Sequence, residues 1–216
     1  MSEAEAAARL EAGRLLFARP CRFVFAAQQL DKLPEPGLPE VAFCGRSNVG
    51  KSSLINALTG QNALARVSHT PGRTRQLNFF ELGEAPTRRL TLVDMPGYGY
   101  AKAGKAVKED WQGLMFDYLR GRPTLRRVIL LLDARIETKD GDRAAMDLLG
   151  EAAVPFQIVL TKADDAKPAS RLARRQEEAA GIVAKRTAAF PRVITTSAAK
   201  GTGIPELRAE IADLAE

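Results

Sequence analysis

Short, continuous runs of apolar residues recur along this chain and alternate with longer segments in which polar and apolar residues mix. Runs without regular polar alternation are typical of strands buried on both faces of a sheet, and the clearest lie at 40–44, 89–94, 127–133 and 155–160. The segments between most of them are long enough for helices. This alternation predicts an α/β fold of three layers, in which helices cover both faces of a mostly parallel, six-stranded sheet.

One turn interrupts this alternation. Residues 83–86, Gly-Glu-Ala-Pro, separate two strand candidates without room for a helix. They therefore predict a hairpin, which adds one antiparallel member to the sheet. Further strands are expected at 23–26, 76–82 and 192–197. Helices are expected at 51–59, 105–120, 141–149, 168–187 and 204–214.

The first 19 residues differ from the rest of the chain. They are rich in alanine, Glu5 follows Ser2 at the spacing of a capping box, and Pro20 ends the segment. We expect residues 1–19 to form an N-terminal extension, helical or partly disordered, and residues 20–216 to form the main domain. The extension lacks the basic and apolar regions of a secretory signal, and no apolar run approaches the ~20 residues of a membrane span, so we expect a cytoplasmic location.

The composition is that of an ordinary soluble globular protein, with 45% hydrophobic and 27% charged residues in a chain of 216. That length suits one domain with a single sheet. The two cysteines, Cys21 and Cys44, cannot provide a disulfide framework. We expect two buried, reduced thiols, and a Cys21–Cys44 disulfide is the alternative.

The strongest chemical signal is the run Gly-Arg-Ser-Asn-Val-Gly-Lys-Ser at 45–52, which follows a strand candidate and precedes a helix candidate. This is the pattern of a phosphate-binding loop. Gly45 and Gly50 let the backbone N–H groups point at phosphate oxygens, and the helix adds its positive end. Lys51 is expected to contact the β- and γ-phosphates, and Ser52 to bind Mg²⁺. The sequence therefore predicts a nucleoside triphosphate site.

An acidic group follows another strand candidate, because the apolar run 90–93 leads into Asp94-Met95-Pro96-Gly97. Asp94 is expected to hold the metal through water. The Gly97 N–H is expected to bind the γ-phosphate and so to sense its presence. An isolated motif of this kind is usually a plain turn. Its position after a strand and downstream of the phosphate-binding loop favours the metal site.

Two further strand candidates end in residues that suit guanine. In Thr-Lys-Ala-Asp at 161–164, the Asp164 carboxylate can accept from both the ring N–H and the exocyclic amine of guanine, a donor pair that adenine lacks. The Lys162 stem is expected to lie along the base, and the N–H groups of Ser197 and Ala198 to contact the guanine carbonyl oxygen. Because parallel strands end at one edge of a sheet, these motifs together predict a guanine nucleotide site.

Together these motifs resemble the EngB family of bacterial GTP-binding proteins, which are translation-factor-like GTPases. The resemblance covers nearly all of residues 20–214. Its most specific parts are the loop at 45–53, Thr-Pro-Gly-Arg-Thr at 70–74 with Leu-Asn-Phe-Phe at 77–80, and Asp-Met-Pro-Gly-Tyr-Gly-Tyr-Ala-Lys at 94–102. The resemblance implies a P-loop GTPase fold, with residues 20–216 as an EngB-type G domain. It also implies that Thr74 closes on Mg²⁺ as a switch residue, although Thr70 competes for this role.

The resemblance further implies a biological role and points to one unusual residue. Proteins of this family are small GTPases needed for assembly of the large ribosomal subunit and for normal septation, so ribosome biogenesis and cell division are implied here. Like the family, this chain has Thr161 where most GTPases have Asn. The missing amide predicts a weaker brace on the phosphate-binding loop and a looser guanine site.

The predicted site comprises three overlapping sets of residues. The catalytic set is Asn48, Lys51, Thr74 and Gly97. The metal set is Ser52, Thr74 and Asp94. The nucleotide-binding set is Gly45, Arg46, Ser47, Asn48, Val49, Gly50, Lys51, Ser52, Ser53, Gly72, Arg73, Thr74, Asp94, Met95, Pro96, Gly97, Thr161, Lys162, Ala163, Asp164, Thr196, Ser197 and Ala198.

The formal charge of +6 and the pI near 9.5 indicate an acidic partner. A face that binds RNA phosphates is expected, and a solvated basic surface is the alternative. Aromatic residues, at 6%, are too few to favour base stacking. The basic residues expected on this face are Arg73, Arg75, Lys102, Lys105, Lys108, Arg120, Arg122, Arg126 and Arg127. Those at 171–186 are expected to form a solvated helix face. We expect a monomer that contacts ribosomal RNA or the large ribosomal subunit.

Ras-like GTPases orient the attacking water with a Gln that follows the glycine of the second switch. Here Tyr98 takes that place, so slow hydrolysis is expected. Asn48 matches the position at which potassium-activated relatives hold K⁺; the alternative is a residue that suits the tight loop. The sequence thus favours a GTP-dependent switch that binds an immature ribosomal subunit. The alternative is a nucleotide-dependent scaffold for a division or membrane partner, which a sustained apolar stripe along 1–19 would favour.

Overall fold

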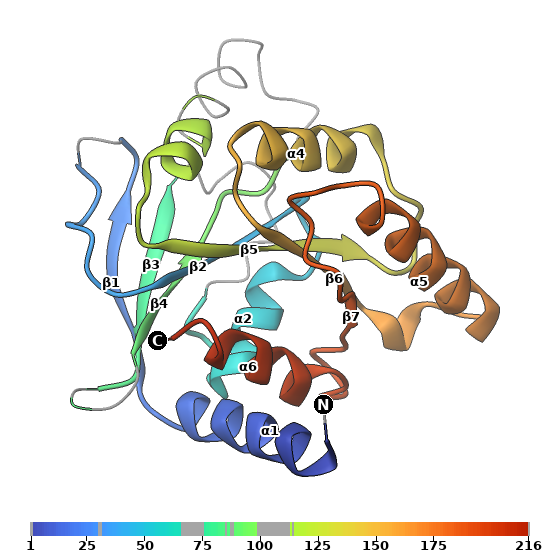
Figure 1. The fold of residues 1–216 in the computed structure, drawn as a ribbon, viewed down its shortest axis with the longest axis horizontal. Coiled ribbons are helices and arrows are strands. Elements are labelled where there is room, and N and C mark those ends of the chain that lie inside the picture. The colour runs from blue at the N-terminus through green and yellow to red at the C-terminus, as the bar shows by residue number, and fades with distance from the viewer. Residues whose placement is uncertain are drawn as a thin grey trace.

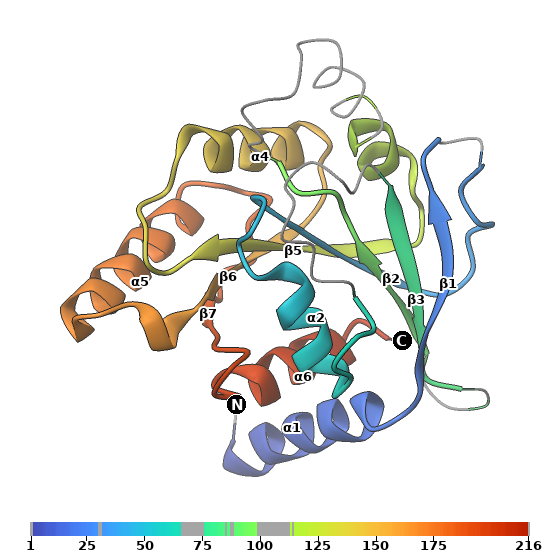
Figure 2. The same ribbon diagram turned by 180° about the vertical axis from the view of Figure 1, so that it is seen from behind.

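The computed structural model describes residues 2–29, 32–65, 76–84, 86, 89–98, 113 and 115–215, and there it places one sheet between two layers of helices (Figures 1 and 2). The strands are β1 (Cys21–Ala27), β2 (Glu40–Gly45), β3 (Leu77–Leu82), β4 (Leu90–Asp94), β5 (Leu125–Asp133), β6 (Phe156–Thr161) and β7 (Ile194–Thr195). The helices are α1 (Glu3–Phe17), α2 (Lys51–Thr59), α4 (Asp140–Glu151), the short 3-10 helix η2 (Ala163–Asp165), α5 (Ala169–Val183) and α6 (Ile204–Ala212). Residues 115–121 are also helical.

The strand order is β1-β3-β4-β2-β5-β6-β7. β4, β2, β5, β6 and β7 pair in parallel, whereas β3 runs antiparallel to both of its neighbours, β1 and β4. A mostly parallel sheet with one antiparallel member is thereby confirmed. The predicted count of six strands is wrong: the sheet has seven, because the strand expected at 23–26 forms over residues 21–27 and pairs with β3 at the edge.

Each face of the sheet has its own group of helices (Figure 1). α1, α2 and α6 pack on one face, with apolar side chains such as Phe17, Leu54 and Leu207 in one cluster. The helix at 115–121 packs on the other face with α4 and α5, where Tyr118 is fully buried. Because both faces are covered, every residue of β2 and β6 is buried, which explains their continuous apolar sequences.

The last strand is shorter than expected. The sequence predicts a strand at 192–197, but β7 contains only Ile194 and Thr195, which pair with Val159 and Leu160 of β6. The N–H of the next residue, Thr196, still donates to the carbonyl of Leu160 at 2.7 Å. The chain then turns into a loop that belongs to the candidate site described below.

The N-terminal and C-terminal helices lie side by side (Figure 2). α1 begins with a capping box in which the Ser2 hydroxyl accepts from the Glu5 N–H and the Glu5 carboxylate accepts from the Ser2 N–H. The two helices approach so closely at Gly13 that a Cβ atom there would lie 2.5 Å from the backbone nitrogen of Ala209. Glycine at position 13 therefore permits the contact between α1 and α6.

Both cysteines are buried and their thiols are free. Burial raises the pKa of the Cys21 thiol and of the Cys44 thiol to about 12. The expectation of two buried thiols is confirmed, and the alternative disulfide is not formed. With so little thiolate at neutral pH, neither side chain is an effective nucleophile.

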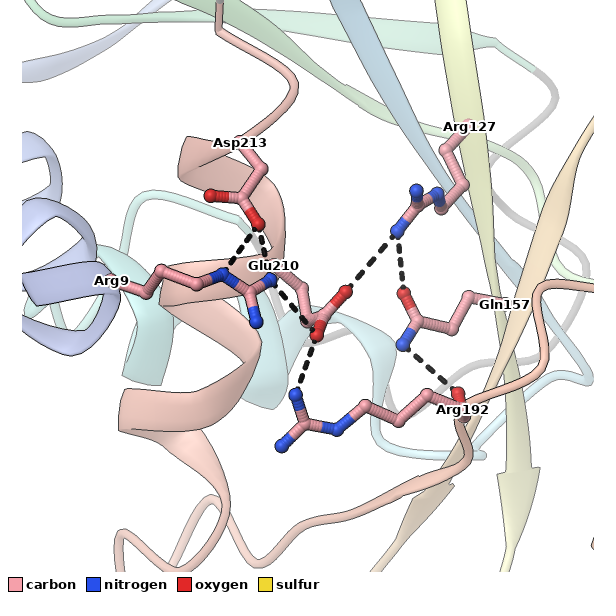
Figure 3. A network of polar contacts seen from close by, with 6 residues as sticks. All are labelled: Arg9, Arg127, Gln157, Arg192, Glu210 and Asp213. Atoms are coloured by element: carbon pink, nitrogen blue, oxygen red, sulfur yellow. Dashed lines mark hydrogen bonds and ion pairs between the residues drawn. The ribbon is translucent and has the colours of Figure 1, made fainter. Parts of the chain in front are cut away.

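A polar network joins α1 and α6 to the sheet (Figure 3). The side chain of Glu210 is 4% exposed, and its carboxylate pairs with Arg192 at 2.8 Å, with Arg9 at 3.3 Å and with Arg127 at 3.4 Å. Arg127 also donates to the side-chain oxygen of Gln157 at 3.0 Å. Three cations compensate for burial of one carboxylate. The predicted surface role of Arg127 is therefore wrong.

Two more basic side chains lie inside the fold. Arg122 is 8% exposed and donates to the buried carboxylate of Glu40, with 2.8 Å between Nε and Oε1. Arg175 is 2% exposed and contacts Glu178 and the Thr138 hydroxyl. The predicted place of Arg122 on an RNA-binding face and that of Arg175 on a solvated helix face are both wrong. In each case, a buried or half-buried carboxylate holds the guanidinium inside.

Candidate functional site

The loop that joins β2 to α2 is tightly folded. A Cβ atom at Gly45 would lie 2.8 Å from Cγ1 of Val49, so the loop packs back on its own strand. Asn48 and Gly50 have positive φ angles of 65° and 101°. Asn and Gly adopt this left-handed conformation most readily, which supports a loop-shaping role for Asn48. Because the N-cap of α2 is Gly50, no side chain covers the first-turn N–H groups there, as in sites that bind phosphate.

Lys51 and Asp94 form an ion pair at the ends of two neighbouring strands. Asp94 ends β4, lies opposite Phe43 of β2 in parallel register, and is 5% exposed. Ser52 is half-buried in the first turn of α2. A hydroxyl and a carboxylate are hard oxygen ligands of the kind that Mg²⁺ prefers. Since the carboxylate lies against the lysine of the phosphate-binding loop, these residues fit a metal-bound phosphate.

The segment that follows β4, from Met95 to Tyr98, lies against the phosphate-binding loop. The Met95 N–H donates to the carbonyl of Phe43 at 3.0 Å, and the Tyr98 N–H donates to that of Gly45 at 3.2 Å. A Cβ atom at Gly97 would lie 3.0 Å from the backbone nitrogen of Ser47. Any larger residue at position 97 would therefore require Ser47 to shift by a few tenths of an ångström.

The end of β6 braces the loop from the other side. The Thr161 hydroxyl donates to the carbonyl of Val49 at 2.7 Å, and Lys162 Nζ donates to that of Asn48 at 2.5 Å. The weaker brace predicted from the missing asparagine is therefore wrong, because a threonine hydroxyl makes the contact. Lys162 itself has a positive φ of 58°, which turns the chain from β6 into η2.

Asp133 and Arg135 belong to this region but were not among the predicted residues. Asp133 accepts from Lys162 Nζ at 3.1 Å and from Arg135 Nε at 2.9 Å. Burial by itself raises the pKa of Asp133, but the hydrogen bonds from Arg135 and Lys162 outweigh it and hold this pKa below its ordinary value. The signal was present in the sequence, since Asp133 directly ends the apolar run of β5.

Asp164 lies in η2 beside the loop that follows β7. A hydrogen bond from the Ser197 hydroxyl holds the pKa of Asp164 below its ordinary value. The Ala163 N–H donates to the carbonyl of Thr196 at 3.1 Å, which ties the two segments together. We expected the Ser197 N–H to contact guanine, but it donates to the carbonyl of Thr202 at 2.9 Å because the loop turns back on itself. The contacts of the Ser197 and Ala198 N–H groups with guanine stay predictions.

The structure thus brings most of the predicted residues to one edge of the sheet, where β2, β4, β5 and β6 end. The phosphate-binding loop lies at the end of β2, the Asp94–Gly97 segment follows β4, and the 161–164 segment follows β6. Gly72, Arg73, Thr74 and the competing Thr70 lie outside the described residues.

Comparisons with known proteins agree with this arrangement. A family model described as "50S ribosome-binding GTPase" matches residues 40–162. The chain is 62% identical over 208 residues to the probable GTP-binding protein EngB of Gluconobacter oxydans, covering 96% of this chain and 89% of that protein. It is 59% identical over 216 residues to the protein of the same name from Granulibacter bethesdensis, covering 100% and 95%.

Among solved structures, Era in complex with MgGDPNP and nucleotides 1506–1542 of 16S ribosomal RNA has a TM-score of 0.67 at 21% identity, covering 84% of this chain and 58% of that one. At that identity the likeness shows the fold alone. Since the family model matches more than half of the chain and the two relatives match nearly all of it, this chain belongs to the EngB family of GTP-binding proteins and is a GTPase with the P-loop fold.

Proposed function

We propose that this protein is a Mg²⁺-dependent GTP switch with a low intrinsic rate of hydrolysis, which acts in assembly of the large ribosomal subunit and is needed for normal cell division. The observation that carries the proposal is the meeting of three segments at one edge of the sheet: the loop at 45–52, the segment at 94–97 and the pair Asp164–Ser197. In parallel α/β sheets, this edge carries the ligand.

In the proposed site, Lys51 and the N–H groups of residues 46–53 hold the phosphates. Ser52, Asp94 and Thr74 hold Mg²⁺, which when bound neutralises charge between the β- and γ-phosphates. The Gly97 N–H donates to the γ-phosphate, so this hydrogen bond forms with GTP and is absent with GDP. The nucleotide state then changes the contacts of the segment at 94–97.

Base selection rests on Asp164, which accepts from two donors of guanine, while Lys162 lies along the base. The Ser197 hydroxyl supports this role because its hydrogen bond holds the pKa of the Asp164 carboxylate below its ordinary value. The brace from Thr161 to Val49 ties the base-binding segment to the phosphate-binding loop. A nucleotide bound at both segments therefore contacts a connected site.

Slow hydrolysis follows from Tyr98, which has no amide to orient water and is only 7% exposed. Its hydroxyl donates to Asp142, so it is already engaged with a protein carboxylate and does not orient water. We include K⁺ at Asn48 in the proposal as a positive charge that could offset the missing group. A partner that supplies such a charge in trans is the alternative.

The ribosomal role is supported by the description of the matching family model, and the solved Era complex contains a GTP analogue and ribosomal RNA. A scaffold for a division or membrane partner is less well supported. Phe17 and Leu16 of α1 are buried in the core cluster that contains α6, instead of forming a sustained exposed stripe along the described helix. None of the helices in the described part of the chain is both long and apolar enough to cross a bilayer.

Sedimentation with purified large-subunit precursors tests the switch directly. The protein should sediment with the precursor in the presence of a non-hydrolysable GTP analogue and stay in the supernatant with GDP. Asp164→Asn provides a matched control, since its association should respond to xanthosine nucleotides and no longer to guanosine nucleotides. Equal sedimentation in all nucleotide states would refute the switch.

A further inference from the structure

Tyr98 forms a buried connection between the phosphate-binding loop and α4. Its backbone is bound to the loop at both polar groups, because its N–H donates to the carbonyl of Gly45 at 3.2 Å and its carbonyl accepts from the Ser47 N–H at 3.0 Å. Its hydroxyl donates to Oδ1 of Asp142 at 2.9 Å. Tyr98 is 7% and Asp142 is 3% exposed, so the connection lies almost entirely out of water.

Asp142 holds Tyr98 from the first turn of α4. Its second oxygen, Oδ2, accepts from the Lys139 N–H at 2.8 Å, so one carboxylate both caps the helix and binds the tyrosine. A Cβ atom at Gly141 would lie 3.8 Å from Cδ2 of Tyr98, which shows that the ring also packs on this turn. Asp142 and residues 46–49 further line a shared cavity of about 200 Å³. The carboxylate is therefore fixed in place beside the phosphate-binding loop.

The chemistry of the pair sets the direction of the hydrogen bond. Burial raises the pKa of Tyr98 above its ordinary value, and the charge of Asp142 raises it further. The phenol is thus protonated at every physiological pH and donates. A buried carboxylate that loses one of its two donors would be left partly unsatisfied, so the hydrogen bond is costly to break.

The residue before Tyr98 is Gly97, where a Cβ atom would lie 3.0 Å from the backbone nitrogen of Ser47. Tyr98 is held at its backbone and at its hydroxyl. Because Gly97 directly precedes it, Gly97 has little freedom to move. A group that is already in place loses less entropy when it binds a ligand. The smaller loss of entropy at Gly97 favours only GTP, since GDP lacks the phosphate that the Gly97 N–H would contact.

We propose that Asp142 is a positioning residue for the γ-phosphate: through Tyr98 it holds Gly97 against the phosphate-binding loop and so raises the affinity for GTP relative to GDP. The proposal rests on the function proposed above for Gly97. It assigns no chemical step to Asp142 or to the phenol, since each is engaged with the other. The link also joins nucleotide sensing to α4, an element that contains none of the predicted site residues.

Tyr98→Phe tests the link, because it removes the hydroxyl and keeps the ring. The ratio of the Kd for a non-hydrolysable GTP analogue to the Kd for GDP should rise by roughly three- to tenfold, mostly through the GTP analogue. Tyr118→Phe is a matched control, since Tyr118 donates to the buried carboxylate of Glu40 at the same distance of 2.9 Å. It should lower the Tm comparably and leave the ratio unchanged.

A double-mutant cycle shows whether Asp142 acts through Tyr98. Asp142→Ala alone should raise the same ratio, and adding Tyr98→Phe should raise it no further, because both changes remove the same hydrogen bond. Asp140→Asn is the control for the charge of the first turn of α4, where Asp140 is exposed and lies outside the described contacts of Tyr98. It should leave the ratio unchanged.

The outcomes separate this inference from the proposed function. If the parent protein binds guanine nucleotides but the Kd ratio is the same in Tyr98→Phe as in the parent, the positioning role is refuted and the nucleotide site stands. A ratio that falls would also refute it, since the link would then oppose GTP binding. Additive effects of the two substitutions would refute action through Tyr98. Failure of the parent to bind guanine nucleotides would overturn both proposals.

Discussion

Thr161 illustrates what a single residue type reveals and what it conceals. Its position at the end of a strand indicates that it belongs to the base-binding segment. Its lack of an amide suggests that the phosphate-binding loop lacks a brace. In the structure its hydroxyl reaches the carbonyl of Val49. The residue types of Lys51, Asp94 and Asp164 indicated their chemistry because each belongs to a motif at or just beyond the end of a strand. The contact of the Thr161 hydroxyl with Val49 could not be predicted, because whether so short a side chain reaches the loop is determined by the relative placement of β2 and β6.

Asp164→Asn should weaken GTP binding by about 10²-fold or more and raise the affinity for xanthosine nucleotides, because an amide donor then faces a ring acceptor. Titration with fluorescent nucleotides measures both effects. Asp165→Asn, on the exposed neighbouring carboxylate, is the control and should change neither affinity. Equal affinities of the parent protein for ATP and GTP would contradict the assignment of guanine.

The pH dependence of guanine binding follows from Ser197, which holds the pKa of Asp164 below its ordinary value. The carboxylate is the acceptor, so GTP affinity should be constant at neutral pH and fall only when the pH drops below the ordinary range of Asp, about 4. Ser197→Ala should move this loss of affinity to higher pH. Nucleotide titration across a pH series, with the parent protein as reference, checks the direction.

Asn48 has two possible roles, as a loop-shaping residue and as a K⁺ ligand. If it holds K⁺ near the β- and γ-phosphates, GTPase rates should be higher in KCl than in NaCl at equal ionic strength, since a fixed cation stabilises developing charge. Asn48→Ala should abolish that difference. Asn48→Gly keeps the left-handed backbone at φ of 65° without the side chain, so it separates ligand from loop shape. Equal rates in the two salts would leave only the loop role.

At the scale of elements, the strands were predictable from the sequence, whereas the pairing of the edge strand β1 was not. β2 and β6 are buried at every residue, so their sequences alone identify them. The strand expected at 23–26 forms as β1, but it pairs with β3, which lies far along the chain, so no local pattern can reveal its place at the edge of the sheet. Likewise, the packing of α1 on α6 depends on Gly13. The sequence does not show that Ala209 lies opposite Gly13, so it does not predict this contact.

Gly13→Ala should destabilise the protein by about 1–3 kcal/mol, because its Cβ would overlap the backbone of α6 and force the two helices apart. For a chain of this size, that corresponds to a fall in Tm of roughly 2–12 °C. Gly181→Ala in α5 is the control, since nothing lies within 4 Å of its Cβ position. It should be neutral or raise stability by up to about 1 kcal/mol, through helix propensity. Thermal unfolding monitored by circular dichroism compares them, and equal Tm values would contradict the close packing.

At the scale of the whole molecule, net charge alone is a poor guide to the binding surface. The chain carries a formal charge of +6, yet Arg122 and Arg175 are buried beside carboxylates and three more arginines surround Glu210 (Figure 3). Arg126, although exposed, lies at the start of β5, at the edge opposite the nucleotide site. Basic residues expected near the site are therefore mainly those of the two segments at 73–75 and 102–108, outside the described residues.

Association with the large subunit should fall as salt rises, because binding to RNA phosphates releases counterions. Charge reversal at Lys105 and Lys108 should weaken it and flatten the dependence of log K on log salt by about one for each phosphate that the protein no longer binds. Arg126→Glu makes the same change of charge at the opposite edge and should leave that slope unchanged. Sedimentation across a salt series measures these slopes. If the Arg126 variant bound as weakly as the lysine variants, attraction would come from the total charge of the molecule, and the site for RNA would not lie beside the nucleotide.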